Sequence, residues 1–524
     1  MSQSDRFAAL KNIALSSVSS YIEYAIFLAA GVLIARSLEP ANYGVYAYSV
    51  WLGGLLVIVC NHGLTITAIR FCAEARGQGD EKKAMAIAGL LNRWHTLSCI
   101  VAFALFAIVL LLVPPKEWDS DFYFYVALTL VGTLGRATCL IKISIGKGFE
   151  QFTIGNIVSV IGSLSSLVLV LLLMAIKAST LQFFMAFSFV GLLTGFIATY
   201  ALRSKGVLNV DHKAIDPVLR KRLVVHTAWT AAVMVLITLG GRTFEMLLLK
   251  TYWSTELVGY FAIAGVLSKG VSDLLAGGFD KVLLPLLTRR MQGADSKTTG
   301  FFVAEATRYY FFLGMLIAGS GYVAIEGAMT LLYGVKYVGA STAVLLSLVI
   351  AGVCLMSSAV NAFQISSDNQ RDRVRAASIT VVVSAAASVM FIPRFGLVGA
   401  MISVACTSFV GLGLAIYQVR KSIEYQFPVK AVLALIISCV LAALLGHWVT
   451  ATVGGKFSFI AGALVFGVTF LVFSSFTRSW SWADYEMIAA MADKVPTIGK
   501  TLSGLIRYMK LRFAFDRHKH QLQQ

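Results

Sequence analysis

Long apolar runs separated by short polar turns fill most of this chain. A run of about 20 apolar residues is long enough to cross a bilayer as an α-helix, and polar breaks mark where the chain leaves the bilayer. The pattern predicts fourteen spans, at about residues 12–35, 44–66, 90–113, 121–145, 154–176, 180–202, 223–249, 257–285, 309–332, 338–363, 375–392, 397–419, 429–449 and 457–477. The expected fold class is therefore an all-α polytopic membrane protein with about 14 transmembrane helices.

The composition agrees with this pattern. Of 524 residues, 58% are hydrophobic and 13% are charged, whereas soluble proteins carry about 45–50% apolar and about 25% charged residues. A soluble enzyme with one membrane anchor is excluded. The seven cysteines lie in or beside apolar runs without metal-ligand spacing, so we expect buried thiols rather than disulfides or zinc ligands. We expect no metal and no cofactor.

The distribution of Lys and Arg predicts the orientation of the spans. With the N-terminus placed in the cytoplasm, 33 of the 44 Lys and Arg residues fall on the inner side and 7 fall in outer turns, one in each turn. Cytoplasmic loops carry such an excess of positive charge. We therefore expect both termini in the cytoplasm, in a cell inner membrane. The apolar run near the N-terminus has no cleavage site before it, so no cleavable signal is expected.

The polar segments predict a domain organisation. We expect an N-lobe of six spans at 1–202, a cytoplasmic linker at 203–221, a C-lobe of six spans at 222–421, two further spans at 422–477 and a cytoplasmic tail at 478–524. Two six-helix lobes around a central cavity are typical of transporters. In the linker, Asp216 and Pro217 form an N-cap and N1 pair that predicts the start of the seventh span.

Two weaker patterns accompany this organisation. The letters GVYA at Gly44 and GYFA at Gly259 each open a span, 215 residues apart, which suggests an internal repeat. In the tail, residues 498–515 have the composition of a basic amphipathic helix on anionic lipid, with a partner-docking helix as the alternative. Trp480 and Trp482 suit an interfacial aromatic belt.

Ionisable side chains within the spans are the best candidates for a functional site, because each costs about 2.5–3.5 kcal/mol unless it is paired or faces water. Arg242 and Glu245 are spaced to pair on one face of the seventh span. Lys269, Asp273 and Asp280 share one stripe of the eighth. These groups could equally be structural ion pairs.

Cations outnumber anions in the full set, which favours an anionic headgroup such as pyrophosphate bound by arginine. Embedded carboxylates are candidates for ion or proton coupling, and the cations nearest the cytoplasm could instead extend to the membrane surface. The candidate substrate-binding cations are Arg70, Arg93, Arg136, Arg242, Lys269, Lys281 and Arg308. The candidate coupling residues are Glu23, Glu245, Asp273 and Asp280.

Three motifs carry a resemblance to a known family. Residues 35–47 read ARSLEPANYGVYA, residues 70–74 read RFCAE after a Gly63-Leu64-Thr65 run, and residues 392–400 read IPRFGLVGA. Their order and spacing resemble the polysaccharide transporter, or O-antigen (Wzx-like) flippase, family of the multidrug/oligosaccharidyl-lipid/polysaccharide exporter superfamily. The resemblance covers roughly residues 8–420 and leaves the last two spans outside the common twelve-helix pattern.

The resemblance implies a non-enzymatic flippase. Its expected substrate and partner is a polyprenyl-pyrophosphate-linked glycan, moved from the inner to the outer leaflet for O-antigen, capsule or exopolysaccharide synthesis, with proton or sodium coupling. Other expected partners are membrane lipids and polysaccharide assembly proteins, and no nucleic acid is expected. An organic-cation antiporter using the carboxylates is the first alternative. A glycan polymerase or ligase is disfavoured by the short outer turns, and the chain has no phosphate-binding loop for ATP hydrolysis.

Overall fold

The structure is a computed structural model that describes residues 22–207, 215–291, 295–366, 370–477 and 479–480, apart from the side chains of residues 119–120, 276–291, 365–366 and 370–371. Its elements are α-helical, with short 3₁₀ and π turns, and begin with a helix over residues 22–37. The helices that follow are α2 (Pro40–Asn61), α3 (Leu64–Gly77), α4 (Glu81–Leu112), α5 (Phe122–Gly148), α6 (Phe152–Ala175), α7 (Thr180–Ser204), α8 (Pro217–Thr238), α9 (Phe244–Tyr252), α10 (Thr255–Met291), α11 (Ser296–Leu332), α12 (Ser341–Cys354), α13 (Ser357–Ser366), α14 (Gln370–Ser422), α15 (Val429–Val453) and α16 (Ser458–Phe476).

The predicted all-α membrane fold is confirmed. Within the described ranges, 12 helices are long and apolar enough to cross a membrane. Fourteen spans were predicted, and the number is lower here for two reasons. Only residues 22–35 of the first predicted span are described, and the predicted spans at 375–392 and 397–419 are the two arms of the single element α14.

Helix α14 is a hairpin that turns at Gly396. This residue has φ 54° and ψ −125°, three residues after Pro393, and a left-handed φ of this kind is easily adopted only by glycine. A Cβ on Gly399 would lie 2.3 Å from the Phe391 carbonyl oxygen. Further from the turn, the hydroxyls of Ser388 and Ser403 are 2.8 Å apart. The two arms therefore lie against each other, with serines between them.

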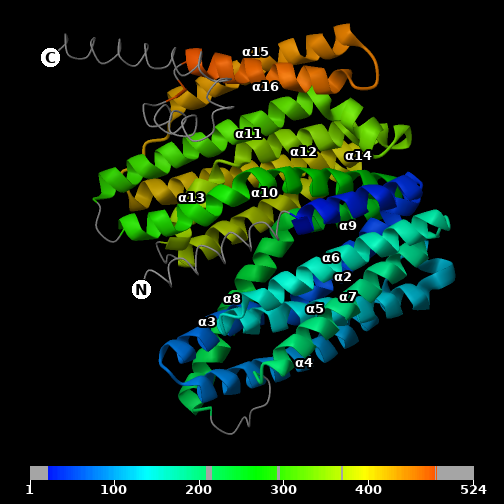
Figure 1. The fold of residues 1–524 in the computed structure, drawn as a ribbon, viewed down its shortest axis with the longest axis vertical. Helices are drawn as coiled ribbons and strands as arrows, with labels where there is room; N and C mark the ends of the chain where they lie inside the picture. The colour runs from blue at the N-terminus through cyan, green and yellow to red at the C-terminus, as the bar shows by residue number, and fades with distance from the viewer. Residues whose placement is uncertain (1–21, 208–214, 292–294, 367–369, 478, 481–524) are drawn as a thin grey trace. The chain divides into compact units, whose positions relative to one another are not determined.

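The chain forms two compact units. The first contains Met1–Gly270, Leu332–Val344 and Gln370–Gly411, and the second contains Val271–Leu331, Leu345–Asn369 and Leu412–Gln524. In the first unit, α2, α4, α5, α6 and α7 run side by side (Figure 1). Helices α5 and α7 approach each other closely at glycines, since a Cβ on Gly135 would lie 2.3 Å from the Gly191 carbonyl carbon.

A break between α2 and α3 brings α3 against α8. The predicted span at 44–66 is interrupted at Gly63, which has φ +84°. A Cβ there would lie 2.7 Å from the Ala231 backbone nitrogen of α8. The start of α8 was predicted correctly, because the Asp216 carboxylate accepts a hydrogen bond from the Val218 backbone N–H at 3.2 Å and Pro217 occupies N1.

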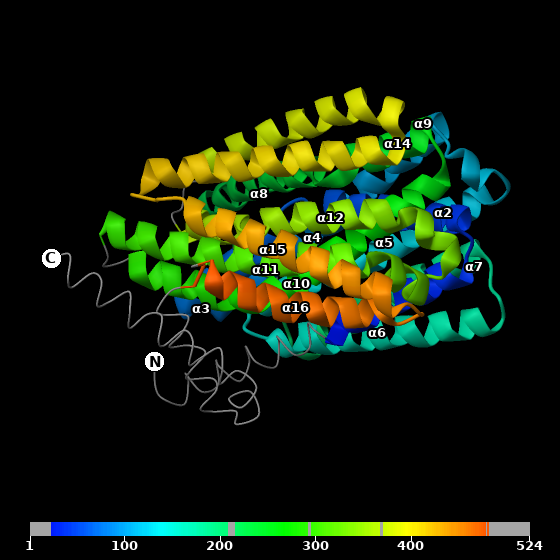
Figure 2. The same ribbon diagram turned by 90° about the horizontal axis from the view of Figure 1, so that it is seen from above.

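The second unit has its own apolar core. Phe311, Met315, Leu435, Phe466 and Phe470 belong to one buried cluster formed by α11, α15 and α16. Helices α15 and α16 lie alongside each other in both views (Figure 1, Figure 2).

Several sequence predictions concern smaller features of the chain. All seven cysteines are free thiols, and five of them are buried. Trp480 donates a hydrogen bond to the Ser474 hydroxyl at 2.9 Å and packs edge-on against Phe312, so its ring has protein partners. Trp482 and the amphipathic segment 498–515 lie outside the described residues. The predicted lobe boundaries stay predictions.

Candidate functional site

Glu245 is the most deeply buried of the predicted coupling residues whose side chains are described. It lies in the first turn of α9, and 1% of its surface is exposed. Its Oε1 accepts hydrogen bonds from the Ser403 hydroxyl at 2.7 Å and the Ser384 hydroxyl at 3.2 Å. Both serines come from the α14 hairpin. The carboxyl group is therefore held where α9 meets the two arms of α14.

The second carboxyl oxygen of Glu245 has different surroundings. Oε2 is buried, and within the described residues no hydrogen-bond donor reaches it. Ser384, Ser388 and Ser403 are each 0% exposed. A buried ionised oxygen without a partner is costly. This cluster of one carboxyl group and three hydroxyls is therefore chemically suited to a proton or a small cation.

The contacts of the described residues include no direct ion pair between Arg242 and Glu245, although the carboxylate still acts electrostatically on the guanidinium. A π-helical turn, Leu239–Thr243, precedes α9, and Arg242 has a left-handed φ of 71° within it. The turn breaks the regular helix on which the predicted i,i+3 pairing was based. Arg242 donates a hydrogen bond to the Ser268 hydroxyl of α10 at 3.3 Å, and its guanidinium lies 5.2 Å from the ring centroid of Phe261.

Arg136 lies between α5 and α7. Its Nη2 donates to the Phe187 carbonyl at 3.1 Å, and its guanidinium stacks on the Phe187 ring at 3.6 Å from the centroid. A Cβ on Gly191 would lie 3.1 Å from the Arg136 Cγ, so this glycine makes room for the side chain. The Arg136 Nε is buried and, among the described residues, has no hydrogen-bond acceptor.

The remaining predicted coupling residues lie on the first helix and on α10. Glu23 is half-buried in the helix over residues 22–37. The next residue, Tyr24, donates to the Val266 carbonyl of α10 at 3.1 Å. Lys269 and Asp273 are exposed on α10. Asp280 and Lys281 lie outside the described side chains.

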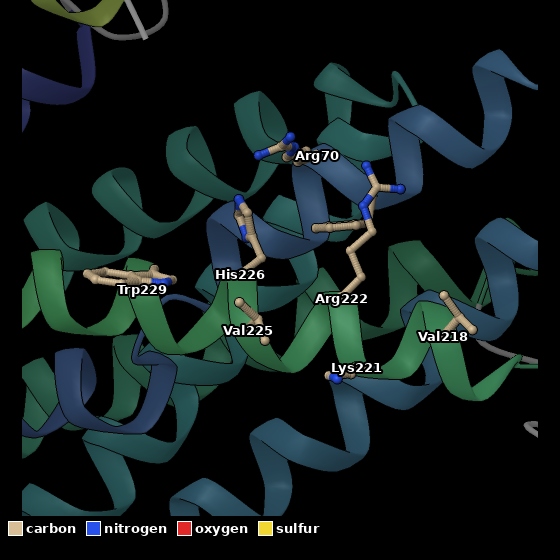
Figure 3. A pocket seen from close by; sticks show the side chains of 8 residues that line it. Arg70, Val218, Lys221, Arg222, Val225, His226 and Trp229 are labelled. Carbon is tan, nitrogen blue, oxygen red and sulfur yellow. The ribbon is translucent and has the colours of Figure 1, made fainter. Parts of the chain in front are cut away.

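Arg70 lines an open pocket of about 430 Å³ between α3 and α8. Figure 3 shows Arg222 and His226 on α8 and Arg70 on α3, with their polar ends on the same side of the pocket. Phe71 is 2% exposed and contacts all three side chains: the guanidinium carbons of Arg222 and Arg70 lie 5.1 Å and 5.7 Å from its ring centroid, and the His226 ring packs edge-on at 5.2 Å.

Lys221 ends the predicted linker at 203–221, Arg222 begins the predicted C-lobe at 222–421, and neither was a candidate site residue in the sequence. The structure adds both, with Trp229, to the residues that line the pocket with Arg70. The available signal was the i,i+4 spacing of Arg222 and His226 on one face of α8. The contact with Arg70 could not be inferred, because it depends on the break at Gly63.

Two predicted cations lie away from this pocket. Arg93 is exposed on α4. Arg308 is buried on α11 in the second unit, where it pairs with Glu305 at 2.7 Å and donates to the Ser479 carbonyl at 2.6 Å. Arg308 therefore holds the segment after α16 against α11.

Comparison with models of known families shows to which family the chain belongs. The family model described as "Polysaccharide biosynthesis protein" matches residues 9–291. The chain belongs to this family. The match covers the first helix, α2 to α9 and all of α10, and so includes Arg70, Arg136, Arg242 and Glu245. The resemblance found in the sequence motifs is confirmed.

Solved structures confirm the fold. Lipid II flippase MurJ in an inward closed conformation is similar with a TM-score of 0.69 and 15% identity, over 88% of this chain and 98% of that one. An inward-facing multidrug resistance MATE family transporter of the MOP superfamily has a TM-score of 0.61 and 13% identity, over 79% and 98%. A MOP superfamily transporter from Pyrococcus furiosus has a TM-score of 0.55 and 13% identity, over 79% and 96%. No curated protein matches the chain by sequence. The chain is a multi-pass membrane protein with the fold of this superfamily.

Proposed function

We propose that this protein is a flippase that moves a polyprenyl-pyrophosphate-linked oligosaccharide from the inner to the outer leaflet of the cytoplasmic membrane. The observation that carries the proposal is the family match over residues 9–291 on a chain with a flippase-like fold. The glycan would serve O-antigen, capsule or exopolysaccharide synthesis. Both termini lie in the cytoplasm in this proposal, as the distribution of Lys and Arg predicts.

Glu245 is the proposed coupling residue. Its Oε1 accepts from Ser384 and Ser403, whereas its Oε2 is buried and lacks a donor among the described residues. Binding a proton or a sodium ion would remove the cost of this unpaired anionic oxygen. Because Glu245 joins α9 to the α14 hairpin, its charge state changes the interaction between these elements. Coupling requires such a differential interaction with two conformations.

Arg136 and Arg242 are the proposed cations for the pyrophosphate. Arg136 is supported by its buried Nε, a donor that has no acceptor in the described part of the chain. Charge-assisted hydrogen bonds from a guanidinium to a phosphate are stronger than neutral ones. Arg242 lies three residues before Glu245, so an anion at Arg242 would be close to the coupling residue. Lys269, Asp273, Asp280, Lys281 and Glu23 remain part of the proposed set.

Two other functions are less well supported. An organic-cation antiporter would need room for its substrate beside the carboxylates, whereas Glu245 and its serines are almost fully buried. A polymerase or ligase would need acid–base groups on a sizeable outer loop, and the turns predicted to face outward are short. The structural neighbours are transporters and flippases, so we propose a non-enzymatic role.

Transport in proteoliposomes tests this function. The purified full chain would be reconstituted with a fluorescent polyprenyl-pyrophosphoryl oligosaccharide, and its appearance in the opposite leaflet would be followed under a proton gradient, a sodium gradient or no gradient. We expect gradient-dependent transfer of the anionic lipid. A parallel set would contain a fluorescent organic cation. Transport of the cation alone would overturn the flippase proposal in favour of an antiporter.

A further inference from the structure

We infer that the pocket between α3 and α8 is a docking site for the pyrophosphate of the lipid-linked substrate at the inner leaflet, before translocation. This inference rests on the proposed flippase function. It assigns a first binding site to residues outside the set of buried arginines, with a lipid-anchored diphosphate as the occupant.

The charge of the pocket fits such a headgroup. Arg70, Lys221 and Arg222 line it together with His226. The Glu74 carboxylate accepts two hydrogen bonds from Arg222, at 2.7 Å and 3.1 Å, and neutralises one of the three permanent cations. Two positive charges therefore remain for the ligand. Arg70 and Lys221 carry these charges, and each terminal nitrogen of Arg222 keeps a second N–H, beyond its bond to Glu74, that can donate to a diphosphate oxygen.

Apolar side chains beside these cations fit the lipid part of the substrate. Val218 is 73% exposed, Val225 is 50% exposed and Trp229 is 60% exposed, and all three line the pocket. Trp229 lies seven residues along α8 from Arg222, which is two helical turns or about 10 Å. A headgroup at the arginines would therefore leave its isoprenoid chain along Val225 and Trp229, toward the middle of the membrane.

The predicted topology places the pocket at the depth of the lipid headgroups of the inner leaflet. Arg70 lies about two turns before the end of α3 at Gly77, and Arg222 lies five residues after the start of α8 at Pro217. Both helix ends face the cytoplasm when the distribution of Lys and Arg is applied. Cations near the end of a membrane helix lie at headgroup level, where the substrate is delivered.

The walls of the pocket are fixed before a ligand binds. The Thr67 hydroxyl lies 3.0 Å from the His226 Nδ1 and 3.1 Å from the Thr227 hydroxyl. The tight contact of Gly63 with α8 lies one turn earlier on the same face. A preformed site avoids the cost of ordering its side chains on binding.

Lipid binding to the full chain in nanodiscs tests the inference. The probe is a polyprenyl pyrophosphate without a glycan, titrated while bound lipid is counted by native mass spectrometry. We expect Arg70→Gln and Arg222→Gln each to raise Kd by about tenfold, the loss of one charged hydrogen-bonding partner. Arg220→Gln is the matched control, because Arg220 is an exposed cation on the same turn of α8 that does not line the pocket. Its Kd should equal that of the unaltered protein.

A double variant tests whether the effect of Arg222→Gln arises only from leaving Glu74 unpaired. Arg222→Gln leaves Glu74 as an unpaired anion near the pocket, so Glu74→Gln/Arg222→Gln restores the charge balance without the arginine. We expect the double variant to remain weak, because it lacks the donors of the arginine. If Arg70→Gln and Arg222→Gln bind as tightly as Arg220→Gln, the pocket is not the docking site. Phosphatidylglycerol and a polyprenyl alcohol are the competitors. Equal displacement by phosphatidylglycerol would overturn the inference in favour of a general anionic-lipid site.

Transport separates failure of the inference from failure of the proposed function. The same variants would be measured in the proteoliposome assay at low and saturating substrate. We expect half-saturation to shift to higher substrate concentration while the maximal rate is kept. Transport by the unaltered protein with no shift in Arg70→Gln would remove the docking site and leave the flippase standing. Absence of transport by the unaltered protein would remove the proposed function itself.

Discussion

Gly44 of α2 and Gly259 of α10 meet at a helix crossing in the first unit. A Cβ on Gly44 would lie 3.3 Å from the Gly259 backbone nitrogen and 1.7 Å from the Thr255 carbonyl oxygen. A Cβ on Gly259 would lie 3.2 Å from the Gly44 Cα. These are the two glycines that open the GVYA and GYFA segments, 215 residues apart in the sequence. The two glycines of the suggested repeat therefore pack against each other, and each allows the other helix to approach closely.

We predict that Gly44→Ala destabilises the protein. The new methyl group would overlap the backbone of α10, which cannot move as the tip of a side chain can, and overpacking of this kind costs about 1–3 kcal/mol. Thermal unfolding of the purified protein in detergent should show a lower Tm. Gly54→Ala is the matched control, because a Cβ at this position of the same helix has nothing within 4 Å and alanine favours the helix. An equal fall in both variants would contradict the crossing.

The sequence predicted the membrane fold because that depends on local patterns. Span positions follow from apolar runs, and the start of α8 follows from Asp216 and Pro217 alone. The prediction of a direct contact between Arg242 and Glu245 assumed an unbroken helix, whereas Leu239–Thr243 forms a π turn. The contact of Glu245 with serines was missed because Ser384 and Ser403 reach it from 139 and 158 residues away. Contacts over such separations are set by packing, which one sequence does not display.

We predict that Glu245→Gln uncouples transport while the fold is kept. Glutamine can still accept the hydrogen bonds from Ser384 and Ser403, and its amide nitrogen can occupy the place of Oε2. It can neither release a proton nor carry the charge that holds a sodium ion. Transfer of the lipid in proteoliposomes should become independent of the gradient, with Tm within a few degrees of the unaltered protein.

The response to pH identifies the coupling ion at Glu245. With proton coupling, dependence of the unaltered protein on a pH gradient should disappear in Glu245→Gln, and sodium should have no effect in either protein. With sodium coupling, the sodium dependence should disappear instead. Ser403→Ala is the companion variant, since it removes the shorter of the two hydrogen bonds and should weaken coupling without abolishing it. Full gradient dependence in Glu245→Gln would exclude this residue as the coupling site.

We predict that Arg136→Met abolishes transport and that Arg136→Lys retains part of it. Lysine keeps the positive charge that the proposed pyrophosphate requires but loses the planar stack on Phe187 and the fork of donors. Methionine keeps the apolar stem and loses the charge. The transport rate and Tm should therefore separate, with rate following charge. Similar losses of rate and Tm in both variants would indicate a purely structural contact between α5 and α7.

We predict that Arg308→Met lowers stability and leaves substrate affinity unchanged. Arg308 was a candidate substrate cation, but its guanidinium pairs with Glu305 and donates to the Ser479 carbonyl, with 8% of the side chain exposed. Removing one member of a buried ion pair costs about 3–5 kcal/mol, reduced here because Glu305 is 30% exposed. Tm should fall, and Kd for polyprenyl pyrophosphate in nanodiscs should equal that of the unaltered protein.

Arg308→Met/Glu305→Gln should recover part of the lost stability, because no unpaired carboxylate remains. A rise in Kd at unchanged Tm would instead return Arg308 to the substrate site, since a residue that only fastens the segment after α16 to α11 has no means of changing affinity without changing stability.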